Sequence, residues 1–154
     1  MSKSRIVDYI DVDMISLDLK SKNKKDIIKE LLDNIKDSKK ILDYDVCLSD
    51  LYSREEIGTT GIGKNVALPH AKTEGVSDLI IGIGISRNGI NYNSIDGEDA
   101  KIFFMFLSPN GEAQEYLKIL ARISRFIREN DFREKIINSK TASEILEVIE
   151  NAEK

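Results

Sequence analysis

The pattern of hydrophobic and polar positions predicts a strand and two amphipathic helices in the first third of the chain. Residues 14–19 alternate between apolar and polar side chains, which is the period of a strand with one buried face. From Ile27 to Ile35 the apolar residues recur at helical spacing, with lysines and acids on the opposite face. Residues 45–57 repeat this pattern and predict a second helix. The preceding residues 1–13 are polar, and we expect them to be loosely held.

Two nearly continuous apolar runs follow, over residues 79–85 and 102–107. Both are too short to cross a membrane and rich in β-branched or aromatic side chains, so they predict strands that are buried on both faces. Residues 87–89, Arg-Asn-Gly, favour a hairpin turn. We therefore expect a short strand over residues 90–92 to pair back along the first run.

The last third of the chain has the pattern of three helices. A long helix is expected over residues 112–129 and a short one near residues 132–138. Thr141 and Glu144 have the spacing of a capping box, which would begin the final helix. Together these elements predict a single α/β domain over residues 14–150, with a mixed β-sheet covered by helices on both faces.

The candidate chemistry lies in residues 54–70, which begin with Arg54 and end with His70, the only histidine of the chain. Three glycines and two threonines separate them, and Pro69 restricts the backbone just before the histidine. We expect a helix end, a glycine-rich loop and then a short strand that has His70 at its far end.

These residue types suit the capture of a phosphoryl group. A neutral imidazole is a nucleophile near pH 7, and one ring nitrogen can attack while the other is held by a hydrogen bond. Backbone N–H groups of a glycine-rich loop can approach an anion closely, and the guanidinium of Arg54 matches phosphoryl oxygens. On residue types alone, however, a histidine that is only packed or exposed remains an equal alternative.

Composition narrows the classes of function. The chain has 154 residues, 41% of them hydrophobic and 32% charged, as expected for one domain with one sizeable core. The net charge is −4 with no basic cluster, so we expect no nucleic-acid partner. No apolar run has the length of a membrane span, and the first residues lack the core of a signal peptide, which predicts a cytoplasmic protein. Cys47 is the only cysteine, so neither a disulfide nor a zinc site is expected.

The segment containing His70 resembles the signature of the enzyme IIA component of the bacterial phosphoenolpyruvate-dependent sugar phosphotransferase system (PTS), in its fructose/mannitol type. That family's pattern is an Arg-Glu pair, a Thr-Gly-hydrophobic-Gly loop and an apolar run that ends in Pro-His. The matching residues here are Arg54-Glu55, Thr60-Gly61-Ile62-Gly63 and Val66-Ala67-Leu68-Pro69-His70. The resemblance extends weakly from about Ile15 to Ile149, and the family's fold agrees with the predicted α/β domain.

The resemblance implies a phosphotransferase that works through a phosphohistidine. The histidine-containing phosphocarrier protein (HPr) would phosphorylate His70 at its tele nitrogen, and His70 would pass the group to a cognate IIB component for sugar uptake. No cofactor, nucleotide or metal is implied at this step. Arg54 would balance the phosphoryl charge. The loop residues Thr60, Gly61 and Gly63 would supply further donors.

Tyr116 stands where members of the family commonly carry a second histidine. A tyrosine can donate a hydrogen bond to a phosphoryl oxygen, but at neutral pH it carries no positive charge. Tyr116 could equally be a core aromatic residue. We also expect Ile62 and Leu68 to form an apolar rim for the protein partners of His70.

Two other functions remain open at this stage. One is a regulatory protein similar to the nitrogen-related branch of the family, in which phosphorylation would control the binding of other proteins. The other is a binding domain in which His70 is inert.

Overall fold

A computed structural model of the chain describes residues 5–154. The helices are η1 (Ile6–Tyr9) and η2 (Val12–Met14), both 3₁₀, and α1 (Lys24–Asp33), α2 (Tyr44–Ile57), α3 (Ala113–Ile127), α4 (Asn130–Ile137) and α5 (Ala142–Ala152). The strands are β1 (Ile15–Ser16), β2 (Gly61–Gly63), β3 (Val66–Ala67), β4 (His70–Lys72), β5 (Ile80–Ile90) and β6 (Ala100–Ser108).

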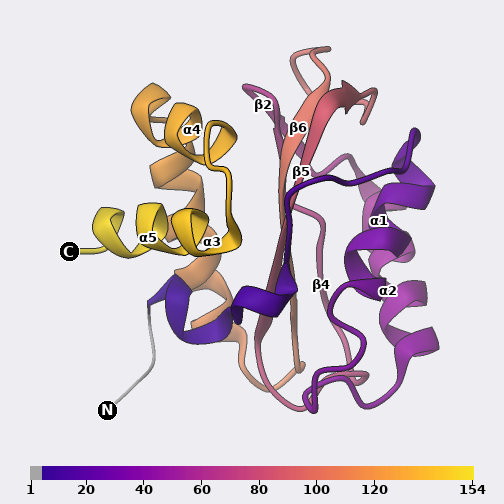
Figure 1. The fold of residues 1–154 in the computed structure, drawn as a ribbon. Helices are drawn as coiled ribbons and strands as arrows, with labels where there is room; N and C mark the ends of the chain where they lie inside the picture. The colour runs from indigo at the N-terminus through magenta and orange to yellow at the C-terminus, as the bar shows by residue number, and fades with distance from the viewer. Residues whose placement is uncertain (1–4) are drawn as a thin grey trace.

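The molecule has three layers, with the sheet between two groups of helices (Figure 1). α1 and α2 cover one face, and α3, α4 and α5 cover the other. The strand order is β1-β5-β6-β3-β2, and β4 also pairs with β6. β5 and β6 are antiparallel, whereas β1, β3 and β4 join the sheet through parallel pairings. The predicted mixed sheet with helices on both faces is confirmed.

The two long strands supply the core on both faces. Ile81, Ile83 and Phe104 belong to the hydrophobic cluster under α3, α4 and α5. Phe103 and Met105, which point the opposite way, belong to the cluster under α1 and α2. Because both faces are covered, β5 and β6 are apolar at nearly every position and do not alternate. The two apolar runs of the sequence are therefore correctly interpreted as central strands.

The hairpin predicted at residues 87–89 is wrong. β5 continues through this segment to Ile90, which pairs with Ala100 of β6. The register shifts between Ile85 and Ile90, and Gly89 lies there with a φ of +78°. A glycine at positive φ can serve a bulge as well as a turn, and here it lets the strand bend without reversing. The chain reverses only in the segment between Ile90 and Ala100.

The expectation that residues 1–13 are loosely held is wrong for residues 5–13, while residues 1–4 lie outside the described part. Ile6, Tyr9 and Ile10 are buried in the cluster under the three C-terminal helices. The carboxylate of Glu153 accepts the N–H groups of Ile6 at 2.7 Å and Val7 at 3.2 Å. Burial of these three apolar side chains docks the segment, and a carboxylate satisfies its first backbone donors.

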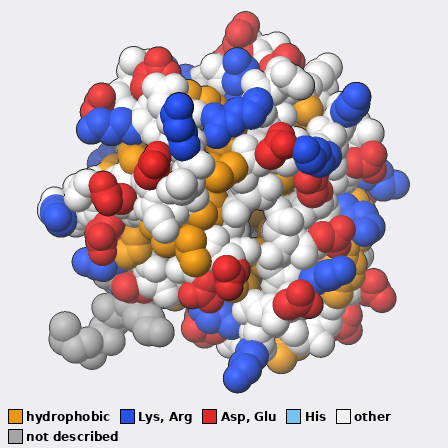
Figure 2. Space-filling view, viewed as in Figure 1, with side chains coloured by type: hydrophobic (Ala, Val, Ile, Leu, Met, Phe, Trp, Pro, Cys, Tyr) orange, Lys and Arg blue, Asp and Glu red, His pale blue; other side chains and the backbone are white. Residues whose placement is uncertain are grey.

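The surface seen from the same side carries acidic and basic side chains that are interspersed (Figure 2). Hydrophobic side chains gather in this view over the C-terminal helices. Within residues 5–154, none of the helices combines the length and the apolar character that crossing a membrane requires.

Candidate active site

His70 is the first residue of β4, directly after a break in the strand that precedes it. β3 ends at Ala67, and both β3 and β4 pair in parallel with β6. Pro69 lies between them and has no N–H to donate, but its carbonyl accepts the N–H of Phe106 at 3.0 Å. His70 therefore begins a new strand. The expectation that it would end the preceding strand is wrong.

The imidazole of His70 is fixed on two sides. Its Nδ1 atom lies 2.5 Å from the carbonyl oxygen of Leu68. A carbonyl only accepts, so Nδ1 carries the hydrogen and Nε2 has the free lone pair. The ring also stacks on Phe106, with the centroids 5.1 Å apart and the planes 12° from parallel. The arrangement presents Nε2, the tele nitrogen, as the nucleophilic atom.

The surroundings of His70 keep its ring neutral. Partial burial lowers the pKa of the imidazole, because the charged form would lose its hydration. The Leu68 carbonyl and the carboxylate of Glu55 favour the charged form, whereas the guanidinium of Arg54 opposes it. The net shift is downward from the usual 6.5, so Nε2 is available for attack at neutral pH.

Tyr116 stands beside His70, as its place in the sequence had suggested. It lies in the first turn of α3, and its ring centroid is 5.8 Å from that of His70 and 5.6 Å from that of Phe106. Burial raises the pKa of Tyr116 above 10, so its hydroxyl keeps its proton at neutral pH. Within residues 5–154 this hydroxyl has no hydrogen-bond partner, which leaves its proton available to an incoming group.

Arg54 belongs to the same neighbourhood. It lies in the last turn of α2, and its Nη1 donates to the carbonyl oxygen of Gly58 at 2.9 Å. Its positive charge lowers the pKa values of both His70 and Tyr116, which places the guanidinium within electrostatic reach of both rings. Arg54 is therefore at once a cation at the helix end and a charge at the candidate site.

Glu55, the next residue, fixes the loop before His70, a role that the sequence pattern did not reveal. Its carboxylate accepts the N–H of Thr60 at 2.7 Å, the hydroxyl of Thr60 at 2.6 Å and the hydroxyl of Tyr92 at 3.1 Å. The ammonium of Lys24 pairs with it at 2.7 Å. Burial pushes the pKa of Glu55 up, but the hydrogen bonds from Lys24 and Thr60 outweigh burial and hold it below the usual 4.5. The Arg-Glu pair was visible in the sequence, but the remote partners were not.

The loop itself is already engaged in contacts within the chain. Thr60 is 3% exposed and gives both its donors to Glu55, and the N–H of Gly61 donates to Thr59 Oγ1 at 3.1 Å. Gly63 has a φ of +93°, and a Cβ atom there would lie 2.9 Å from a carboxylate oxygen of Asp96. That Thr60, Gly61 and Gly63 bind a phosphoryl group stays a prediction. For Thr60 and Gly61, the donors would first have to leave their present partners.

The expected apolar rim is only partly correct. Leu68 is 2% exposed, because its side chain points into the core, while Ile62 is partly buried. Ile57 at the end of α2 and Leu117 beside Tyr116 are exposed to 82% and 58%. Leu117 fits the apolar pattern of the helix expected over residues 112–129, which predicts an inward-facing side chain, so its exposure corrects that prediction. These two side chains follow Arg54 and Tyr116 closely in sequence, so they replace Leu68 as candidates for the rim.

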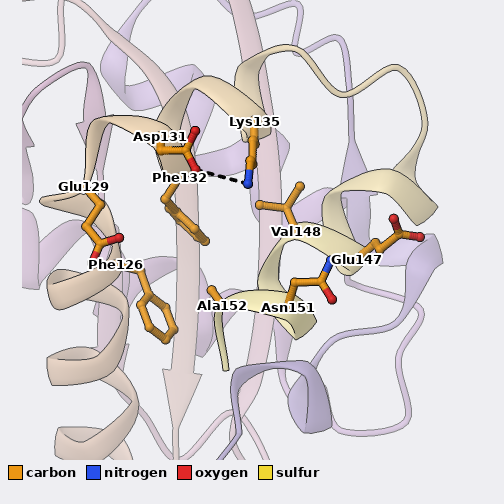
Figure 3. Close-up of a pocket in the computed structure, with 9 residues that line it drawn as sticks. All are labelled: Phe126, Glu129, Asp131, Phe132, Lys135, Glu147, Val148, Asn151 and Ala152. Carbon is orange, nitrogen blue, oxygen red and sulfur yellow. Dashed lines mark ion pairs between the residues drawn. The ribbon is translucent and has the colours of Figure 1, made fainter. Parts of the chain in front are cut away.

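A separate hollow of about 400 Å³ lies between the three C-terminal helices (Figure 3). Phe126 and Phe132 form part of its lining, and Asp131 pairs with Lys135 at its edge at 3.1 Å. None of its lining residues belongs to the cluster around His70. Over residues 5–154, no group of histidine, cysteine or acidic side chains is arranged to hold a metal ion.

The site therefore combines a neutral imidazole with a free Nε2, a guanidinium and an unpartnered hydroxyl. Such a set can accept a phosphoryl group and stabilise its oxygens, which defines the class as an α/β phosphohistidine protein. Residues 8–152 match the family described as "Phosphoenolpyruvate-dependent sugar phosphotransferase system, EIIA 2". The chain belongs to this family, whose members are phosphotransferases that work through a phosphohistidine and pass the group to a IIB component.

Known relatives agree with this assignment. The fructose-specific EIIA component of Haloferax volcanii is 33% identical over 138 residues, which cover 90% of each chain. The fructose-specific EIIABC component of Bacillus subtilis is 29% identical over 150 residues, and this chain spans 24% of its length. Among solved structures, the nitrogen regulatory protein IIA-Ntr of Neisseria meningitidis has a TM-score of 0.87 at 24% identity. That match covers 94% of this chain and 98% of the other, and it shows that the two share a fold.

Proposed function

We propose that His70 is the phosphoryl acceptor of this chain, that HPr is its donor and that a cognate IIB component receives the group. The observation that carries the proposal is the bond from Nδ1 of His70 to the Leu68 carbonyl. It leaves Nε2 as the only imidazole nitrogen in the sequence with a free lone pair, next to Arg54 and Tyr116. Within the domain proposed over residues 14–150, no other side chain offers this chemistry.

The bonds, electron pairs and protons of the transfer are all accounted for by the two histidines, without a cofactor. The Nε2 lone pair of His70 forms a bond to phosphorus as the P–N bond of the donor phosphohistidine breaks. The electron pair of that bond returns to the donor imidazole, and the proton on Nδ1 of His70 stays in its bond to Leu68. Delivery to the IIB component reverses these roles, with Nε2 of His70 as the leaving group. Since such transfers pass through a loose transition state, positioning and electrostatics are the main contributions of the protein.

Arg54 and Tyr116 have different roles in this scheme. The guanidinium of Arg54 can turn from the Gly58 carbonyl and place two donors on phosphoryl oxygens. The hydroxyl of Tyr116 donates one neutral hydrogen bond. We assign Thr60 mainly to shaping the loop, because Glu55 already holds both its donors. Any direct donor from the loop is then a backbone N–H group, and that of Gly61 would first have to leave Thr59 Oγ1.

The relatives from Haloferax volcanii and Bacillus subtilis favour sugar uptake as the process in which this chain acts, since both are named fructose-specific components. The name of the Bacillus subtilis relative joins A, B and C components in one chain, which is the arrangement in which a IIA unit feeds transport. A regulatory role of the nitrogen type is the alternative outcome. The two differ in whether the phosphoryl group leaves His70 for a IIB component.

The test is phosphorylation in a reconstituted chain of phosphoenolpyruvate, enzyme I, HPr and this protein. We expect one phosphoryl group per molecule, labile in acid and stable in base, and none on a His70→Ala variant. Addition of a fructose-type IIB component should then remove the label from His70. Labelling of His70→Ala contradicts the assignment of the site. A label that stays on His70 with every IIB component supports the regulatory role instead.

A further inference from the structure

Lys72 lies on the same side of β4 as His70. The strand runs from His70 to Lys72, and alternate residues of a strand point to the same face. Ala71 between them is buried, whereas Lys72 is exposed. The ammonium of Lys72 is 5.4 Å from the centroid of the Tyr116 ring, which itself is 5.8 Å from the ring of His70. Lysine and histidine thus contact the same aromatic ring from one strand.

Lys72 has no acidic partner that would neutralise it. Over residues 5–154, no carboxylate lies within ion-pair distance of its ammonium group. In the described part of the chain that ammonium makes no hydrogen bond or ion pair, and it lies over the Tyr116 ring. Other exposed lysines, such as Lys20 and Lys29, are paired with nearby aspartates. A solvated cation on a flexible stem is therefore free to turn toward a new anion.

The phosphoryl group needs more positive charge than the residues assigned so far provide. It brings up to two negative charges and three acceptor oxygens to Nε2 of His70. Arg54 supplies one positive charge, and its guanidinium also serves the Gly58 carbonyl. Tyr116 stays protonated and uncharged. At the position where a second histidine could have carried charge, this chain has none.

We propose that Lys72 is the second cation of the phosphoryl site. Its ammonium group moves from the face of Tyr116 onto an oxygen of the phosphoryl group on His70, while Tyr116 donates its hydroxyl to another. In this role Lys72 touches the transferred group, and it replaces the charge that tyrosine cannot carry. This inference rests on the proposed function, since it requires His70 to be phosphorylated.

The experiment measures the equilibrium constant for transfer between phosphorylated HPr and this protein, in the parent, Lys72→Gln, Lys72→Arg and the control Lys140→Gln. Lys140 is another exposed lysine, in the connection between α4 and α5. Removing a charged donor from an exposed site should shift the equilibrium toward HPr by about 3- to 10-fold. Lys72→Arg should stay within about 2-fold of the parent, because it keeps the charge, and Lys140→Gln should not differ from the parent.

Salt provides a readout that a merely structural role of Lys72 would not move. Raising the ionic strength from about 0.05 to 0.5 M screens exposed charges, so the gap between the parent and Lys72→Gln should narrow. The ³¹P resonance of the phosphohistidine should also shift in Lys72→Gln but not in Lys140→Gln. Thermal unfolding of the unphosphorylated proteins should be the same for all, because Lys72 and Lys140 are both exposed.

The outcomes distinguish a failure of the role of Lys72 from a failure of the proposed function. If the parent accepts no phosphoryl group from HPr, the proposed function fails and the role of Lys72 fails with it. If the parent is phosphorylated but Lys72→Gln shows the parent's equilibrium constant and salt dependence, only the role of Lys72 is overturned. A 3- to 10-fold shift that Lys72→Arg does not rescue also overturns it, because a charge-based role requires the rescue.

Discussion

Replacing Glu55 by glutamine tests whether its carboxylate holds the loop that leads to His70. The carboxylate is 9% exposed and joins three parts of the chain that are remote in sequence. These are Lys24 at the start of α1, Thr60 at the start of the loop and Tyr92 after β5. Glutamine keeps the shape of the side chain and one acceptor oxygen, but it removes the charge and leaves the ammonium of Lys24 without its carboxylate partner.

The expected loss follows from the burial of the pair. Breaking a buried ion pair typically costs about 3–5 kcal/mol, because the remaining charge is left without compensation. Lys24 is 20% exposed and can recover part of its hydration, so we expect about 2–3 kcal/mol. For a domain of this size, that corresponds to a fall of roughly 4–12 °C in the midpoint of thermal unfolding.

The pH dependence has a definite sign. The folded-state pKa of Glu55 lies below its usual 4.5, so its contribution to stability is complete at pH values above 4.5. The contribution is lost as the pH falls through the folded-state pKa. The difference in unfolding free energy between the parent and Glu55→Gln should therefore be constant from pH 6 to 8 and shrink at acid pH.

Chemical denaturation at several pH values measures this difference, with Glu56→Gln as the matched control. Glu56 is the adjacent residue, carries the same charge and is exposed. We expect Glu56→Gln to change the unfolding free energy by less than about 0.5 kcal/mol. If Glu55→Gln is no more destabilised than Glu56→Gln, or if the difference does not shrink in acid, the carboxylate does not hold the loop.

Three further predictions concern transfer at His70. Arg54→Lys should slow acceptance of the phosphoryl group with the fold intact, because lysine keeps the charge but lacks the planar set of donors of the guanidinium. Arg54→Ala removes the charge as well and should slow acceptance more. If both variants keep the parental rate, Arg54 is only a cation at the helix end. Tyr116→Phe should slow transfer several-fold with little change in thermal stability, since it removes one neutral donor worth about 1 kcal/mol. If Tyr116→Phe keeps the parental rate while Tyr116→Ala mainly loses stability, Tyr116 is a core residue. Because burial lowers the pKa of His70, the rate of phosphoryl transfer, measured from pH 5 to 8, should stay constant as the pH falls through 6.5 and decline only at lower pH. A decline centred at or above pH 6.5 contradicts the neutral, buried imidazole.

Local sequence determined much of the secondary structure and the main candidate residues. Asn23, Asp43 and Thr141 each begin a helix by accepting a backbone N–H three residues on. Such caps depend only on neighbouring residues, so they can be inferred from sequence. The order of Arg54, the glycines and His70 is equally local, which is why the candidate site was visible before the fold.

Contacts between remote residues decided the rest. Whether Gly89 ends a hairpin or bends a strand depends on β6, because the partner strand fixes the register beyond Ile85. Ile6 and Tyr9 could be recognised as core only once the C-terminal helices gave them a surface to dock on. Likewise, Leu117 lies within an apolar helix pattern, but the packing of α3 on the sheet leaves it exposed.

The same division holds within the site. Sequence identified His70 as the candidate acceptor, but its tautomer depends on the Leu68 carbonyl, and its pKa depends on burial and on the charge of Arg54. That Tyr116 and Lys72 meet near the imidazole follows from how α3 packs beside β4. Hydrogen bonds, desolvation and charge act over a few ångströms in space. Separation along the chain does not predict which residues are close in space. The chemical type of each residue could therefore be taken from the sequence, but the contacts among these residues could not.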